Sequence, residues 1–178
     1  MKIQKTYKIR SGNNYSNRFN LPLPNRLLYR PTEMVAKLTL HESMIYRNDN
    51  DGWMKLCGFS RGHHHENSFR FVWRCWDGNL QIAAYFYSDK KRDDWRLASW
   101  PIRSIPFVCE IYLRAWILSN RIYFELVSVC HKNTGFVLGI DNPLPSFGYL
   151  LTPHFENPKA PQTGAPHDIY LPLEITIR

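Results

Sequence analysis

A two-residue turn between two alternating segments limits the possible folds of this chain more than any other feature. Asp77-Gly78 readily adopts the positive φ angles of a type I′ turn, and apolar and polar residues alternate on both sides of it over 68–88. Such a turn fixes which residues face each other across the two strands. The expected core-facing pairs are Phe69 with Phe86, Phe71 with Ala84, Trp73 with Ile82 and Cys75 with Leu80. The segment therefore predicts a β-hairpin with one buried face.

The other face of this hairpin is polar and aromatic, and we expect it to bind a ligand. It combines guanidinium groups, an amide and phenols, which together can hold the carboxylate and hydroxyl groups of a sugar. The predicted ligand-binding residues are Arg70, Arg74, Gln81, Tyr85 and Tyr87. The alternative is a partly covered outer face whose arginines lie along aromatic rings. No residue is assigned a catalytic role from the sequence.

The same two-residue period continues beyond this hairpin. A second hairpin is expected to turn at 119–120 and to place Arg114 opposite Glu125, which is a favourable charge pair. A long strand is expected over 35–46. Residues 93–102 are predicted to form an irregular connection instead, because they lack a clear alternation and contain a proline.

The two ends of the chain differ from each other. Residues 168–177 alternate regularly, and we expect an edge or bulged strand there because Pro172 has no N–H group to donate. Residues 1–33 are polar and rich in Asn and Pro, so we expect an extended arm with one short strand at 5–10, followed by one domain over 34–178. About nine to eleven antiparallel strands with regularly spaced turns predict an all-β fold, an antiparallel jelly-roll β-sandwich.

Composition narrows the choice of partners. A net charge of +8 favours an acidic partner, such as an anionic glycan or an acidic protein, including a partner in a homo-oligomer or a larger assembly. We do not expect nucleic acid, because no recognisable binding module is present. No segment has the roughly 20 apolar residues of a membrane helix. The four cysteines lack CxxC spacing and are expected to be reduced, and no cofactor is predicted.

Two histidine-containing motifs could carry chemistry. His63-His64-His65 could bind Zn²⁺ through imidazole nitrogens, but a structural zinc site needs four placed ligands, so we expect a hydrogen-bonded loop and no metal. His167-Asp168 could be a base with its orienting carboxylate. Neighbouring side chains of a strand point to opposite faces, however, so we expect this pair to close a turn.

The order of these segments resembles the concanavalin-like jelly rolls of polysaccharide lyases and related glycan-binding proteins. The resemblance covers roughly residues 35–178 and rests on the first hairpin and on the late segment with His154-Phe155-Glu156-Asn157 and 165–168. It implies that Arg70, Arg74 and Gln81 neutralise a uronate carboxylate while Tyr85 or a histidine exchanges a proton. The chain departs from the family where Glu156-Asn157 replaces a pair of glycines, and the family's catalytic histidine and tyrosine have no matching positions. The chain also resembles uncharacterised short proteins of gut bacteria and their phages.

Two functions are compatible with these observations. The leading hypothesis is a non-catalytic recognition or assembly module, lectin-like in architecture, which could bind a glycan or form part of a phage virion. The alternative is a polysaccharide lyase that acts on an anionic glycan. Residues 1–20 contain no apolar stretch of the kind found in signal peptides, so we expect synthesis in the cytoplasm without export, and a place in a phage particle would fit this expectation.

Overall fold

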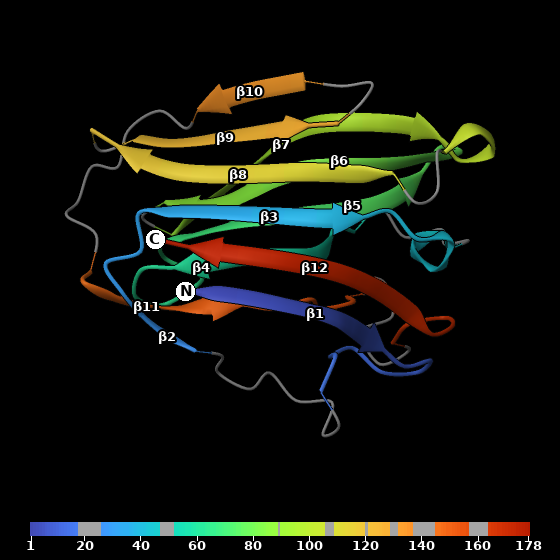
Figure 1. Cartoon of the computed structure of the whole chain (residues 1–178), viewed down its shortest axis with the longest axis horizontal. Coiled ribbons are helices and arrows are strands. Elements are labelled where there is room, and N and C mark those ends of the chain that lie inside the picture. Colours follow the sequence, from blue (N-terminus) through green and yellow to red (C-terminus); the bar gives the residue numbers. More distant parts are fainter. Residues whose placement is uncertain are drawn as a thin grey trace.

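The computed structural model of the chain is a sandwich of two antiparallel sheets (Figure 1). It describes residues 1–17, 26–46, 52–88, 90–105, 109–119, 121–128, 132–136, 145–156 and 164–178. The strands are β1 (Lys2–Ile9), β2 (Leu27–Tyr29), β3 (Glu33–Thr39), β4 (Met54–Ser60), β5 (Ser68–Trp76), β6 (Asn79–Ser88), β7 (Lys91–Pro101), β8 (Glu110–Leu118), β9 (Arg121–Val127), β10 (Lys132–Phe136), β11 (Phe147–Leu151) and β12 (Ile169–Ile177). Two short 3-10 helices, η1 (Glu42–Met44) and η2 (Ile102–Ser104), follow β3 and β7. The predicted all-β jelly-roll sandwich is confirmed.

The strands divide equally between the two sheets. The first sheet has the order β1-β12-β3-β8-β9-β10, and the second has the order β2-β11-β4-β5-β6-β7. Strands that are distant in the chain are therefore neighbours in both sheets. In particular, β11 lies beside β4, which places residues near 150 next to residues near 58.

The first hairpin forms as predicted. Asp77 and Gly78 have φ angles of 50° and 67°, which are the positive values that a type I′ turn requires. β5 and β6 pair in the expected register along their whole length, from Ser68 opposite Tyr87 to Trp76 opposite Asn79. The second hairpin, β8 with β9, also has the expected register, with Arg114 opposite Glu125.

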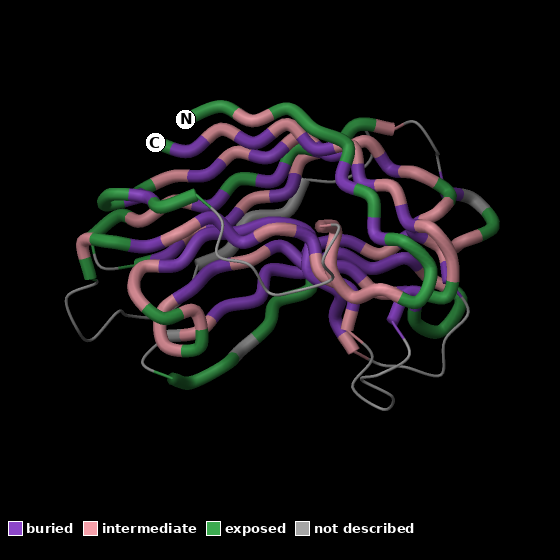
Figure 2. Tube along the Cα trace, turned by 90° about the horizontal axis from the view of Figure 1, so that it is seen from below, coloured by how far each residue is buried: buried purple, intermediate pink, exposed green. Residues whose placement is uncertain are grey.

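The core lies between the two sheets and is rich in aromatic side chains. Figure 2 shows buried residues alternating with more accessible ones along the strands, as the two-residue period requires. Trp73, Phe69, Phe71, Phe124 and Phe155 are the largest side chains that are almost completely buried. Cys57 and Cys75 are buried free thiols and Cys109 is a half-buried one, whereas Cys130 lies outside the described residues.

Two of the expected boundaries are wrong. The strand expected over 35–46 ends at Thr39, because His41 caps η1 by accepting a hydrogen bond from the Ser43 backbone N–H. The connection expected over 93–102 is part of β7, an edge strand of 11 residues that pairs with β6. A register shift at Ile82/Ala83 interrupts its alternation, and its charged side chains, which protect a sheet edge, resemble those of a loop.

The last strand is not at an edge, which corrects the expectation drawn from Pro172. β12 lies between β1 and β3. Its pairing with β3 begins only at Leu173, however, so Pro172 has a partner on the β1 side alone, opposite Thr6. The missing N–H group therefore costs no ladder hydrogen bond on the β3 side.

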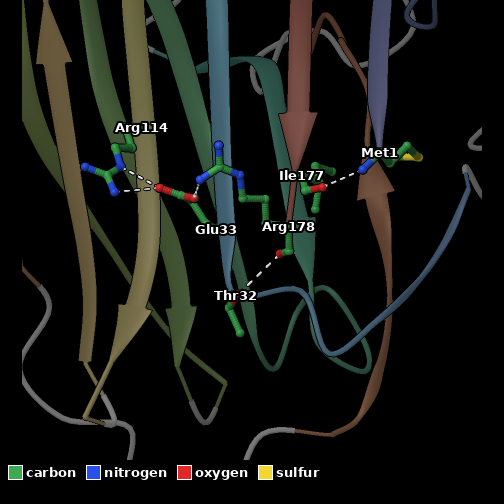
Figure 3. A network of polar contacts seen from close by, with 6 residues as sticks. All are labelled: Met1, Thr32, Glu33, Arg114, Ile177 and Arg178. Carbon is green, nitrogen blue, oxygen red and sulfur yellow. Dashed lines mark hydrogen bonds and ion pairs between the residues drawn. The ribbon is translucent and has the colours of Figure 1, made fainter.

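Residues 1–33 contribute strands to both sheets. β1 is longer than the strand expected at 5–10 and pairs with β12, while β2 pairs with β11 in the other sheet. The two termini lie side by side, and the Met1 ammonium donates to the Ile177 carbonyl at 2.7 Å (Figure 3). In the part of the chain that is described, no helix has the length and apolar character needed to cross a membrane.

A charged network fixes the end of β3 to its neighbours. The Glu33 carboxylate accepts from Arg114 at 2.6 Å and from Arg178 at 3.3 Å, as Figure 3 shows. The side chain of Glu33 is only 14% exposed. Arg114 thus forms its ion pair with a carboxylate on β3, although Glu125 faces it in the hairpin.

Candidate functional site

The candidate site lies on the outer face of the second sheet, around Arg70 on β5. Arg70 is paired with Tyr85 of β6 on one side and with Gly58 of β4 on the other. A Cβ atom on Gly58 would lie 2.9 Å from the Cγ atom of Arg70 and 2.1 Å from the Phe69 carbonyl oxygen. Glycine is therefore required at this position because the β5 backbone and the base of the Arg70 side chain approach β4 too closely for a side chain.

The Arg70 side chain is half-buried, and one of its guanidinium nitrogens is left unpaired within the described part of the chain. Its Nε atom is buried and has no hydrogen-bond partner among the described residues. Burial lowers the pKa of Arg70, and the nearby groups that favour its charge are Tyr85, Tyr149, Tyr87 and, more weakly, Glu156. A half-buried cation with a buried and unused donor costs stability, so this side chain is well suited to bind an anion.

A histidine and a tyrosine are hydrogen-bonded beside Arg70. The Nδ1 atom of His64, in the loop between β4 and β5, lies 2.5 Å from the Tyr149 hydroxyl on β11. The Ser68 hydroxyl donates to the His64 carbonyl at 2.6 Å and holds this loop in place. Burial and then the Arg70 charge lower the pKa of His64 to about 4. The imidazole is therefore neutral at pH 7, and its unprotonated nitrogen can accept a proton.

A lysine and a glutamate form the next part of the site. Lys55 on β4 is buried, and its ammonium group forms an ion pair with Glu156. Burial lowers the pKa of Lys55 and opposes the effect of the Glu156 charge. Burial alone would raise the pKa of Glu156, but the charge and hydrogen bond of Lys55, together with the charges of His154 and Arg70, lower it. The two groups are therefore paired near Arg70.

The segment after β11 supplies this glutamate because it continues along the edge of β4. His154 and Lys55 exchange backbone hydrogen bonds of 2.8 and 3.0 Å, in the register that Leu151 and Gly58 set within β11 and β4. The His154 ring stacks on Tyr15 at 4.2 Å, and burial followed by the Lys55 charge lowers its pKa to about 4. A second neutral imidazole thus lies beside the cations.

Two of the predicted ligand-binding tyrosines border the site. Tyr85 is buried, and its hydroxyl donates to that of Tyr87 at 3.3 Å. Arg92 lies over the Tyr85 ring at 5.3 Å. Burial raises the pKa of Tyr85 well above its ordinary value, so this phenol keeps its proton.

Arg74 and Gln81 lie at the other end of the same face. Arg74 is four residues from Arg70 on β5, which corresponds to about 13 Å along the strand. Its Nε donates to the Gln81 amide oxygen at 2.9 Å, and its guanidinium lies 4.1 Å from the Trp53 ring and 5.5 Å from the Trp76 ring. At Arg74 the structure thus has the arrangement given above as the alternative to ligand binding, an arginine that lies along aromatic rings.

Arg70, Tyr85 and Tyr87 are therefore together, whereas Arg74 and Gln81 form a separate cluster. The sequence did not single out Lys55, Tyr149 or Glu156 for binding. Tyr149 carried no signal beyond the alternation of its strand, and Glu156 was marked only as a departure from the lyase-like pattern. Lys55 reaches Arg70 through the pairing of β4 with β5, and Tyr149 and Glu156 do so through the pairing of β11 and the following segment with β4, which local sequence cannot reveal.

In the part of the chain that the structure describes, neither histidine motif forms the site that its residue types allow. The described residues contain no group of histidine, cysteine, aspartate and glutamate side chains that could hold a metal ion. His167 and Asp168 do not bind each other: the His167 ring lies 2.9 Å from the Ser43 carbonyl, and Asp168 pairs with Lys8 at 2.5 Å and accepts from the Ser11 backbone. All three interactions tie neighbouring segments of the fold together.

Comparisons with known proteins agree on the fold. No family model matches the chain, and no curated protein matches its sequence. An alginate lyase from Klebsiella pneumoniae superposes with a TM-score of 0.54 at 12% identity, covering 83% of this chain and 59% of that one. An alginate lyase from a Chlorella virus gives a TM-score of 0.50 at 11% identity, over 98% and 82% of the two chains. A functionally unknown protein from Saccharomyces cerevisiae gives 0.51 at 9% identity, over 99% and 84%. These similarities show a shared jelly-roll fold.

Proposed function

We propose that the protein is a polysaccharide lyase that binds an acidic glycan on the outer face of the second sheet. The observation that supports this most strongly is the enclosed Arg70 Nε without a hydrogen-bond partner among the described residues, next to the His64–Tyr149 pair. An anionic sugar would supply the missing acceptor. Two of the structural neighbours are alginate lyases, whose fold this chain shares.

The residues present can perform a β-elimination. Arg70 would bind the uronate carboxylate and make the proton on the neighbouring carbon more acidic. Tyr149 would take this C5 proton while it passes its own proton to His64. The electrons of the C5–H bond would then form the C4–C5 double bond as the C4–O bond breaks. The leaving oxygen would receive a proton from Tyr149, which recovers its own from His64, so the enzyme returns to its starting state.

Recognition without cleavage is the second candidate, and Glu156 favours it. Its carboxylate already pairs with Lys55 and interacts with Arg70, so it occupies part of the positive charge that an acidic substrate would need. A binding module can tolerate this competition more easily than an enzyme, which must stabilise extra negative charge in the transition state. The prediction of a component of a phage particle or other assembly stays a prediction.

One experiment separates these functions. Purified protein is incubated with alginate, glucuronan and heparin, and the ultraviolet absorbance of unsaturated product is followed while binding is measured by calorimetry. Cleavage that Arg70→Lys and His64→Gln each abolish supports the lyase. Binding of a polymer without any product contradicts the lyase and supports the recognition module. Tyr112→Phe, on the outer face of the other sheet, is the control variant and should leave the rate of cleavage unchanged.

A further inference from the structure

Three large apolar side chains are exposed together at the edge of the second sheet. Leu27 is 81% exposed, Tyr29 65% and Phe147 66%. Tyr29 faces Phe147 across the β2–β11 pair, and their rings meet edge to face at 5.3 Å. Leu27 faces Tyr149 in the same pair. Exposed apolar clusters of this kind mark interaction sites, because soluble proteins otherwise keep such side chains apart.

Two arginines flank these rings. The Arg30 guanidinium lies over the Tyr29 ring at 5.5 Å, and its Nε donates to the Ser146 hydroxyl at 3.2 Å. Arg61 donates to the Pro145 carbonyl at 2.7 Å. Burial and then the charge of Arg30 lower the pKa of Arg61, so the two guanidinium groups lie close enough to repel each other. A negative charge between them would relieve this repulsion.

The cluster is continuous with the candidate site. Tyr149 and Phe147 alternate on one strand, so both point to the outer face of the sheet, and so do Leu27 and Tyr29 opposite them. Tyr149 contacts His64 at the Arg70 site. From the spacing of strands and residues, Tyr29 and Phe147 lie roughly 15 to 20 Å from Arg70. A single sugar cannot reach both places, whereas an oligosaccharide can.

We propose that Leu27, Tyr29 and Phe147 form a second subsite that holds a distant sugar of the same acidic glycan chain. This inference rests on the proposed function, because it takes the sugar at Arg70 as its starting point. The aromatic faces offer an apolar surface for the C–H groups of a pyranose ring. Arg30 and Arg61 supply the positive charge for its carboxylate. The polymer would then cross β5, β4, β11 and β2 in succession.

The test compares polymer with short oligosaccharide. Alginate, glucuronan and heparin, each as long polymer and as trisaccharide, are titrated into the native protein and into the double variant Tyr29→Ala/Phe147→Ala. We expect the double variant to bind the polymer roughly fivefold to tenfold more weakly, with unchanged affinity for the trisaccharide. Arg70→Lys should weaken both, since the Arg70 site serves every chain length. Tyr112→Ala, a 45% exposed tyrosine on the other sheet, should change neither.

Three results would overturn the second subsite. If the double variant binds polymer as tightly as the native protein, the proposed function stands and the subsite alone falls. If the native protein binds no polymer at all, both proposals fall. If sedimentation shows a native dimer that the double variant dissociates while polymer affinity is unchanged, the cluster is an interface between copies. Tyr29→Leu/Phe147→Leu, which keeps the apolar surface and removes the rings, must reproduce the loss with an unchanged melting temperature.

Discussion

The outer faces of the two sheets both carry ion pairs, including Lys55 with Glu156 on the second sheet, but the two faces differ at Arg70. On the first sheet, cations have carboxylate partners close by: Lys2 with Glu174 at 2.6 Å, Lys8 with Asp168 at 2.5 Å, Lys37 with Glu110 at 2.5 Å and Arg114 with Glu33 at 2.6 Å. On the second sheet, Arg70 is more deeply enclosed, and its Nε lacks a hydrogen-bond partner among the described residues. The paired charges are those that a fold needs for solubility and modest stability. The buried Nε of Arg70, unpaired within the described part of the chain, is expected to cost stability, and the proposed function accounts for its retention by a bound anion.

The largest difference between the two faces should appear in activity. Tyr149→Phe removes only the phenolic oxygen bonded to His64, and we expect it to lower the rate of glycan cleavage about a hundredfold or more, because general acid–base catalysis contributes at least this factor. Tyr112→Phe makes the same change on the first sheet and should leave the rate unchanged. Equal rates for both variants would remove Tyr149 from the proposed chemistry.

The histidines of the candidate site should make stability depend on pH. His154 has a pKa of about 4 in the folded protein, below the unfolded value near 6.5, so the unfolded chain binds more protons between these values. The stability from this neutral imidazole is complete above about pH 6.5 and is lost as the pH falls toward 4. We expect the free energy of unfolding to fall by roughly 2 kcal/mol over this window. Urea unfolding at several pH values measures it.

The matched variants sharpen this expectation. His154→Gln should reduce the pH dependence of stability in the window from about 6.5 to 4, and the contribution of His64, whose pKa is also lowered to about 4, should remain. His63→Gln removes an exposed imidazole in the neighbouring loop and should leave most of the dependence in place. A slope that survives His154→Gln undiminished would assign the titration to other groups.

The paired charges of the first sheet should affect stability and nothing else. Glu33→Gln removes the carboxylate shared by Arg114 and Arg178, and we expect it to lower the free energy of unfolding by about 1 kcal/mol, since both arginines are partly solvated. Glycan binding should not change. Glu42→Gln, at an exposed glutamate, is the control. A loss of binding in Glu33→Gln would show that the first sheet takes part in recognition.

The smallest effect is expected at Arg74. Its guanidinium lies on the Trp53 and Trp76 rings and donates to Gln81, so Arg74→Ala should lower stability by roughly 0.5 to 1 kcal/mol and polymer affinity by less than about threefold. Calorimetric titration of the native protein and the variant checks this. A tenfold loss of affinity would instead support the prediction that the sequence made for this residue.

Most of the fold could be predicted from local sequence, because a two-residue turn determines both the register and the faces of a hairpin. The wrong predictions concern segments whose structure depends on strands that are distant in the chain. Pro172 suggested an edge strand, yet β12 is internal and only locally lacks a partner on the β3 side. β7 looked irregular because its bulge against β6 and its charged edge hide the alternation.

The site was predicted only in part, for the same physical reason. Arg70, Tyr85 and Tyr87 share one face of one hairpin, so their proximity follows from alternation. Lys55 joins them through the β4–β5 pairing, whereas Tyr149 arrives through the β4–β11 pairing, between segments almost a hundred residues apart, which no local period specifies. Arg74 lies on the same face of β5 as Arg70, but its guanidinium packs on the Trp53 ring. The position of Trp53 also depends on tertiary structure.

The most direct test of this account is the urea unfolding of Arg70→Met, with Arg114→Met as the matched variant on the first sheet. If Arg70 is retained for a ligand, replacing its enclosed cation by an apolar side chain of similar length should leave the free energy of unfolding unchanged or raise it by about 1 kcal/mol. Arg114→Met should lower it. A loss of about 2 kcal/mol or more in Arg70→Met would show that this arginine supports the fold, and would contradict the account.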